Sequence, residues 1–160
     1  MKKTISKLGG LIALVGIIVI ISIFFIKFNN DREDKVLIKD LTIISEKGNY
    51  DDEAENQSNF IVILTNQSYE NTKVSLTVYV DGNELISQNC KTKNQHTGYY
   101  YYYNLVGAHI IKVVSDDGQI VEKTMIMYEN APLWVLMSYW GDGENAKINF
   151  DIMDSPFLWK

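Results

Sequence analysis

The longest uninterrupted apolar stretch of the chain lies near its N-terminus, at residues 8–26, where 19 residues carry no charge. A helix of that length measures about 28 Å, close to the ~30 Å hydrocarbon core of a bilayer. The stretch is apolar on every side, unlike the amphipathic helix of a globular core. It ends at Ile26 and Lys27 without the small residues of a signal-peptide cleavage site. We therefore predict an uncleaved transmembrane helix over residues 8–27.

Beyond residue 35 the apolar residues have a different spacing along the chain. Runs of five to nine residues alternate with turn residues, a pattern typical of an antiparallel sandwich or barrel. Hairpin turns are predicted at residues 81–83 and 116–118, where Gly follows Asp. Residues 46–59 are rich in acids and predict a long loop, and no run of ten residues has a helical period. Strands are expected at 36–45, 60–64, 74–80, 85–91, 99–105, 108–115, 120–128, 133–140 and 146–152.

These patterns predict a domain organisation with one membrane span. A basic tail (1–7) precedes the transmembrane helix (8–27), a polar tether follows (28–35), and a β-sandwich of eight or nine strands occupies residues 36–160. Basic residues are similarly frequent at both ends of the helix, so their number alone does not set the orientation. The short basic tail without acids favours a cytoplasmic N-terminus, and long C-terminal domains translocate largely regardless of charge. We expect the sandwich to be extracytoplasmic, at the cell membrane.

The net charge of the predicted sandwich limits the kinds of partner that it is expected to bind. From residue 28 onward the chain has 11 basic residues (15 minus the four lysines before residue 28) and all 20 acids, a net charge of −9. An acidic domain repels nucleic acid and anionic lipid, so neither is an expected partner. Cys90 is the only cysteine, which excludes an internal disulfide and a thiolate metal cluster.

One segment resembles a known kind of module. Residues 105–118 (LVGAHIIKVVSDDG) are similar to the L-x-x-G-x-H-x-I-x-V-x-x-D-x-G run of bacterial immunoglobulin-like and adhesion-type surface modules. The resemblance implies an immunoglobulin-like antiparallel sandwich with residues 105–128 as its last long hairpin, and a role as a spacer or binding module. The chain departs from that pattern by continuing through residues 133–159, which leaves the topology open.

Candidate catalytic and metal-binding residues are few. A cysteine hydrolase would need Cys90 paired with His96 or His109 and an orienting group, but the segment around Cys90 matches no nucleophile signature. The two histidines have no zinc-ligand spacing, and the acidic segments 51–55 and 142–145 lack the spacing of a calcium loop. We predict no catalytic residue, no metal and no cofactor.

Aromatic residues provide the candidate binding surface. Five tyrosines in a row occupy one expected strand, with alternate side chains on opposite faces, and two tryptophans share a face of another strand. Exposed Tyr and Trp rings bind glycans and proteins, although such residues also pack sandwich cores. The candidates are Tyr99, Tyr101, Tyr103, Trp134 and Trp140.

The leading functional hypothesis is a membrane-anchored, non-enzymatic module that contacts another membrane or wall-proximal protein. A tether of about eight residues reaches at most ~25 Å, so its partner lies near the bilayer surface. Alternatives are a glycan-binding module using the tyrosine strand, a hydrolase using Cys90 and a histidine, and a subunit whose helix packs inside a membrane complex.

Overall fold

A computed structural model of the chain describes residues 38–92, 98–141 and 143–153. The expected transmembrane helix (8–27) and tether (28–35) lie outside these residues, and none of the helices among them has the length and apolar character to cross a bilayer. The elements are β1 (Leu41–Gly48), α2 (Asp52–Asn56), β2 (Phe60–Asn66), β3 (Lys73–Val80), β4 (Asn83–Lys91), β5 (Gly98–Leu105), β6 (Gly107–Ser115), β7 (Ile120–Met127), β8 (Leu133–Trp140), the 3₁₀ turn η1 (Gly143–Asn145) and β9 (Lys147–Met153).

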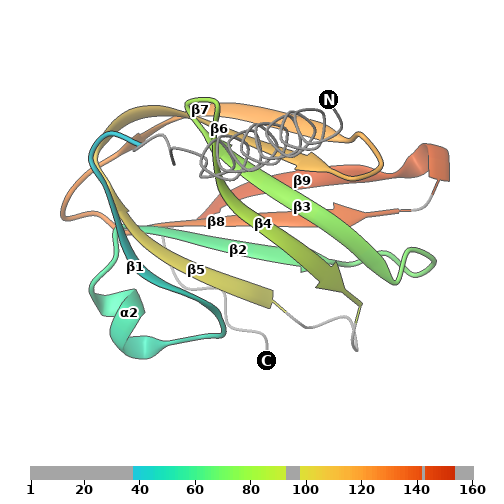
Figure 1. Cartoon of the computed structure of the whole chain (residues 1–160), viewed down its shortest axis with the longest axis horizontal. Coiled ribbons are helices and arrows are strands. Elements are labelled where there is room, and N and C mark those ends of the chain that lie inside the picture. Colours follow the sequence, from blue (N-terminus) through green and yellow to red (C-terminus); the bar gives the residue numbers. More distant parts are fainter. Residues whose placement is uncertain (1–37, 93–97, 142, 154–160) are drawn as a thin grey trace, which may run out of the picture. The chain divides into compact units, whose positions relative to one another are not determined.

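The strands form two sheets that enclose one core. The five-stranded sheet has the order β1-β5-β2-β8-β9 and the four-stranded sheet the order β4-β3-β6-β7. Both are visible in Figure 1, with β3 and β4 in front of β2 and β8. Apolar side chains from both sheets make a single cluster between them, including Phe60, Val62 and Leu64 from β2 and Val74, Leu76 and Val78 from β3. The predicted all-β sandwich is confirmed.

The hairpins follow the turn residues. The chain reverses at Asp81 and Gly82, whose φ angles of 50° and 83° lie in the left-handed region that short hairpin turns require. The strands on either side, β3 and β4, pair antiparallel. The other predicted hairpin, β6–β7, also forms with antiparallel pairing, and β8 and β9 make a further antiparallel pair.

One strand pair corrects the prediction of a wholly antiparallel sandwich. β2 and β8 run parallel, with Phe60 opposite Leu133 and Asn66 opposite Tyr139. The two strands are separated by β3 and β4, by β5, and by the hairpin β6–β7, so the chain reaches β8 by a long connection and not by a tight turn. Periodicity finds strands but not their neighbours, which is why the sequence did not reveal this pair.

The predicted acidic loop at 46–59 is also wrong in part. β1 continues to Gly48, and α2 occupies five residues within the segment. Asp51 caps this helix, because its Oδ1 accepts hydrogen bonds from the backbone N–H groups of Glu53 (3.2 Å) and Ala54 (3.1 Å). Acids in the first turn of a helix interact favourably with its dipole, so the acidic composition supports the helix start. A helix this short is below the length that apolar periodicity detects.

A second apolar cluster covers the outer face of the five-stranded sheet. It contains Ile61, Ile63, Tyr102, Trp134 and Leu136, and Ala54 of α2 packs against it. Because β2 lies between the inter-sheet core and this cluster, all seven of its residues are buried. β7, in contrast, alternates between buried and exposed positions along its C-terminal half.

Candidate functional site

The three tyrosines with odd numbers in β5 face the core. Tyr101 and Tyr103 are 6% and 0% exposed, and Tyr99 packs against the same inter-sheet cluster. Their parity with Leu105, which is also buried, places them on the inner face of the sheet. The exposed row of rings that a glycan-binding strand needs is therefore not formed by these residues.

The hydroxyl groups of two of these tyrosines connect β5 to one strand of each sheet. Tyr101 donates a hydrogen bond to Oε1 of Gln88 on β4 (2.5 Å), and Tyr103 donates to Oε1 of Glu46 on β1 (2.8 Å). Burial raises the pKa of Tyr101 to about 12. Burial, and then the hydrogen bond to the Glu46 carboxylate, raises the pKa of Tyr103 well above its ordinary value. Both residues thus hold neutral hydroxyl groups that join strands.

The two tryptophans share the outer face of the five-stranded sheet, as parity predicts, but differ in exposure. Trp134 is 7% exposed and belongs to the outer cluster, and its edge lines a polar cleft of about 370 Å³ with Pro132 and Asn104. Trp140 is 39% exposed and donates from Nε1 to Oγ of Ser138 (2.9 Å). The structure therefore does not gather the five predicted aromatic residues on one exposed surface.

Cys90 and His109 do not form a catalytic pair. Cys90 is fully buried, and burial raises the pKa of its thiol to about 12, which disfavours the thiolate. The two ring nitrogens of His109 are engaged elsewhere, Nδ1 with Oδ2 of Asp81 (2.7 Å) and Nε2 with the carbonyl oxygen of Val106 (3.1 Å). His109 therefore fixes the turn before β4 to the start of β6. The other candidate partner, His96, lies outside the described residues.

Within residues 38–92, 98–141 and 143–153, no group of three or more His, Cys, Asp or Glu side chains could hold a metal ion. In the acidic segment 51–55, the Asp51 carboxylate serves as the helix cap described above. Of the segment 142–145, residues 143–145 form the turn η1 and Asp142 is not described.

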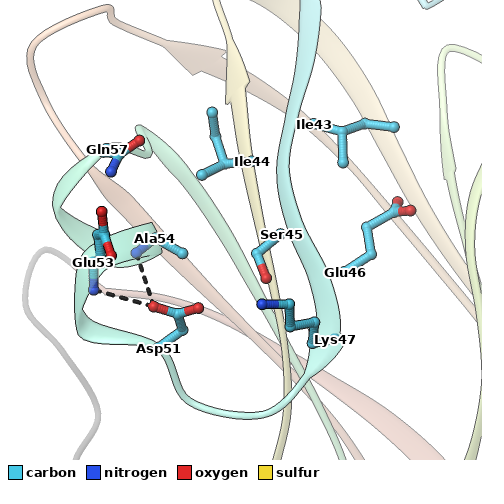
Figure 2. A pocket seen from close by; sticks show the side chains of 9 residues that line it. All are labelled: Ile43, Ile44, Ser45, Glu46, Lys47, Asp51, Glu53, Ala54 and Gln57. Atoms are coloured by element: carbon cyan, nitrogen blue, oxygen red, sulfur yellow. Dashed lines mark hydrogen bonds between the residues drawn. The ribbon is translucent and has the colours of Figure 1, made fainter.

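Another cleft lies beside β1, at residues that the sequence did not indicate as a site. It has a volume of about 350 Å³ and lies between β1 and α2. The labelled side chains in Figure 2 show its two walls, one from β1 and one from the start of α2. The lining residues are Ile43, Ile44, Ser45, Glu46, Lys47, Asp51, Glu53, Ala54 and Gln57.

An irregular stretch of β1 forms the first wall. The pairing of β1 with β5 shifts register on both sides of Ser45, which lies opposite Tyr102. A bulge of this kind changes the direction of side chains relative to regular alternation. Figure 2 shows the consecutive side chains of Ile44 and Ser45 both on the α2 side of β1, whereas Ile43 points away.

Ser45 has an unusual environment for a hydroxyl group. The residue is 8% exposed, and its Oγ has no hydrogen-bond partner among the residues that the structure describes. A buried polar atom without a partner costs about 1–3 kcal/mol, so native structures contain few of them. The other buried side-chain atom without a partner in the described part of the chain, Oδ1 of Asn89, is on β4 and does not line the cleft.

The second wall is held firmly by a buried phenol. The backbone N–H of Asp51 donates to the hydroxyl oxygen of Tyr102 (2.9 Å), which fixes the start of α2 to β5. Burial raises the pKa of Tyr102 to about 12, although this hydrogen bond opposes the rise. Ala54 anchors the same turn in the outer cluster, while Glu53 next to it remains exposed at the cleft.

Negative charge predominates around the cleft. Asp51 and Glu53 line it against one base, Lys47, while Glu46 borders it with its side chain on the opposite side of β1. Two further acids of α2, Asp52 and Glu55, lie beside the hydroxyl of Tyr50, and hydrogen bonds to their carboxylates raise the pKa of that phenol. The cleft therefore combines an acidic rim with the apolar side chains of Ile44 and Ala54.

Sequence reasoning missed this site for two local reasons. The bulge at Ser45 leaves no mark in an alternating pattern, and α2 is too short for a helical period. The acidic run at residues 51–55 was the available signal, because Asp followed by acids is typical of a helix N-terminus.

Comparisons with known proteins give no family for the chain. No family model, curated protein or solved structure matches it.

Proposed function

We propose that this chain is a membrane-anchored, non-enzymatic protein whose extracytoplasmic β-sandwich binds another protein close to the membrane surface. Residues 8–27 serve as the single transmembrane helix, with the N-terminus in the cytoplasm. The sandwich is of the immunoglobulin-like kind, which the segment 105–118 resembles, and modules of that kind act mostly as spacers or binding modules.

The cleft between β1 and α2 is the observation that carries the binding role. It is a recess with two supported walls, a hydroxyl group that lacks a partner and several charged side chains at its rim. Binding sites usually combine apolar walls with a few polar groups that fix the orientation of the ligand. The short tether supports the location, because it keeps the start of the sandwich within about 25 Å of the bilayer.

The anchored arrangement is tested by protease treatment of intact cells that express the chain with an epitope tag at each end. Loss of the C-terminal tag with survival of the N-terminal tag is expected. Survival of both tags on intact cells, with loss of both after lysis, would overturn the orientation. Recovery of a product trimmed near residue 28 from the medium would overturn the anchor.

The interaction role is tested by co-purification in mild detergent. The full chain is expected to retain a membrane or wall-proximal protein, and the fragment from residue 30 is expected to retain less of it because tethering concentrates both partners at one surface. If neither form retains a partner after chemical crosslinking in cells, the binding role is wrong.

A further inference from the structure

We propose that the cleft between β1 and α2 binds an arginine side chain presented by a partner protein. This inference rests on the proposed function and names the chemistry that the partner brings to the site.

Two polar features of the cleft fit a guanidinium group. Ser45 Oγ is buried without a hydrogen-bond partner among the described residues, so the hydroxyl of this lining residue can gain one by turning toward the cleft. The carboxylates of Glu53 and of Asp51, whose Oδ1 also caps α2, line the same recess and provide acceptors of opposite charge. An arginine carries five N–H donors in a rigid fork and no acceptor, so one side chain can serve the hydroxyl and a carboxylate together.

The apolar part of the cleft fits the rest of the side chain. Ile44 and Ala54 line the cleft from opposite walls and both contact the outer apolar cluster. The three methylene groups of an arginine pack on apolar surface while the charged end reaches polar groups.

The charge of the site selects a cation over an anion. Within the cleft the carboxylates of Asp51 and Glu53 outnumber the one base, Lys47, and Asp52 and Glu55 add negative charge from the same helix. Glu46 is partly engaged, because its Oε1 accepts the hydrogen bond from Tyr103. Lys47 is the one lining base, and among the described residues it forms no ion pair, so it opposes the incoming cation.

The source of the guanidinium is a protein segment, because the cleft lies beside an edge strand. β1 pairs only with β5 among the described strands. A strand edge and an adjacent recess together accommodate an extended backbone that carries one inserted side chain.

The test uses the full chain in uncharged detergent micelles and NMR titration of its backbone amides. The probe is an acetylated and amidated glycine–serine peptide with one central arginine. We expect shifts concentrated at Ser45, Glu53 and Ala54, and no such shifts with the same peptide carrying citrulline. Equal binding of both peptides would overturn the proposal. Binding of free Nα-acetylarginine amide as tightly as the peptide would overturn the assignment to a protein segment.

Three substitutions are expected to change peptide binding, two by weakening it and one by strengthening it. Glu53→Gln is expected to weaken peptide binding about two- to fivefold and Lys47→Gln to strengthen it by a similar factor, as for single solvent-exposed charge pairs. Ser45→Ala is expected to weaken binding about two- to tenfold while raising the unfolding temperature, because it removes a buried hydroxyl that lacks a partner in the free protein.

Glu84→Gln supplies the matched control, because Glu84 is an exposed acid at the start of β4. Its substitution removes the same charge and is expected to leave peptide binding unchanged. Equal weakening by Glu84→Gln and Glu53→Gln would overturn the proposal in favour of attraction by net charge alone.

The outcome is separable from that of the proposed function. Retention of a cellular partner that Glu53→Gln does not diminish would refute the cleft and leave the binding role standing. Peptide binding without any retained partner would refute the binding role and leave the cleft standing.

Discussion

The outer faces of the two sheets differ sharply, although both sheets contribute to one core. On the five-stranded sheet, Ile61 and Ile63 of β2 are 1% and 0% exposed and lie in a second apolar cluster. On the four-stranded sheet, Ile110 and Ile126 are 44% and 56% exposed. The same residue type therefore has a structural role on one face and a surface position on the other. Local alternation cannot distinguish these cases, because the difference comes from what lies over each face.

The largest expected effect separates the two faces directly. Ile63→Ala should lower the free energy of unfolding by about 2–5 kcal/mol, because it removes buried methyl groups and leaves a cavity. Ile126→Ala should change it by no more than about 0.5 kcal/mol, as for other exposed positions. Urea unfolding followed by tryptophan fluorescence measures both. Similar losses in the two variants would show that the two outer faces are equally covered.

A single hydroxyl tests how the outer face holds α2. Tyr102→Phe should cost about 0.5–1.5 kcal/mol, because it removes the acceptor for the backbone N–H of Asp51 while preserving the ring. Tyr128→Phe, at a position that is 63% exposed, is the matched control and should have almost no effect. Hydrogen exchange should quicken at Glu53 and Ala54 in the first variant alone, because their amides donate to the cap.

The stability of the protein at alkaline pH should depend on the ionisation of the same Tyr102 hydroxyl. The folded state holds the pKa of Tyr102 at about 12, above the ordinary value of 10.0, so folding favours the neutral phenol. Stability from this group is fully present below pH 10.0 and is lost as the pH rises toward about 12. Unfolding free energies measured across that window should fall, and Tyr102→Phe should make the fall shallower. An unchanged slope would mean that this phenol ionises without cost in the folded protein.

The smallest expected effect lies on the exposed face of the four-stranded sheet. Lys112 is opposite Glu122, and its Nζ lies 5.8 Å from the centroid of the Tyr79 ring. Because exposed pairs of this kind contribute little, Lys112→Gln should lower the free energy of unfolding by no more than about 0.5–1 kcal/mol. A loss as large as that of Ile63→Ala would show that this face is covered in the folded protein.

Sequence reasoning succeeded where structure is local. The alternation at residues 74–80 and the glycine turns after Asp81 and Asp117 were sufficient for the all-β class and the hairpins, because period-two burial and turn chemistry act over a few residues. It could not show that β2 is buried on both faces, since that depends on strands distant in sequence and on a helix of only five residues. The cleft was not predicted either. The burial of Ser45 beside α2 depends on the register shift between β1 and β5, which the sequence does not show.

The parallel pairing of β2 with β8 has a consequence for biosynthesis. Residues 60–66 are translated early, but their neighbour at residues 133–140 leaves the ribosome some 70 residues later. Until then the nascent chain carries the most apolar strand of the sandwich with one long side unprotected, a state in which strands associate wrongly. Contacts so distant in sequence also slow folding. The chain therefore completes its five-stranded sheet only after residues 133–153 have left the ribosome.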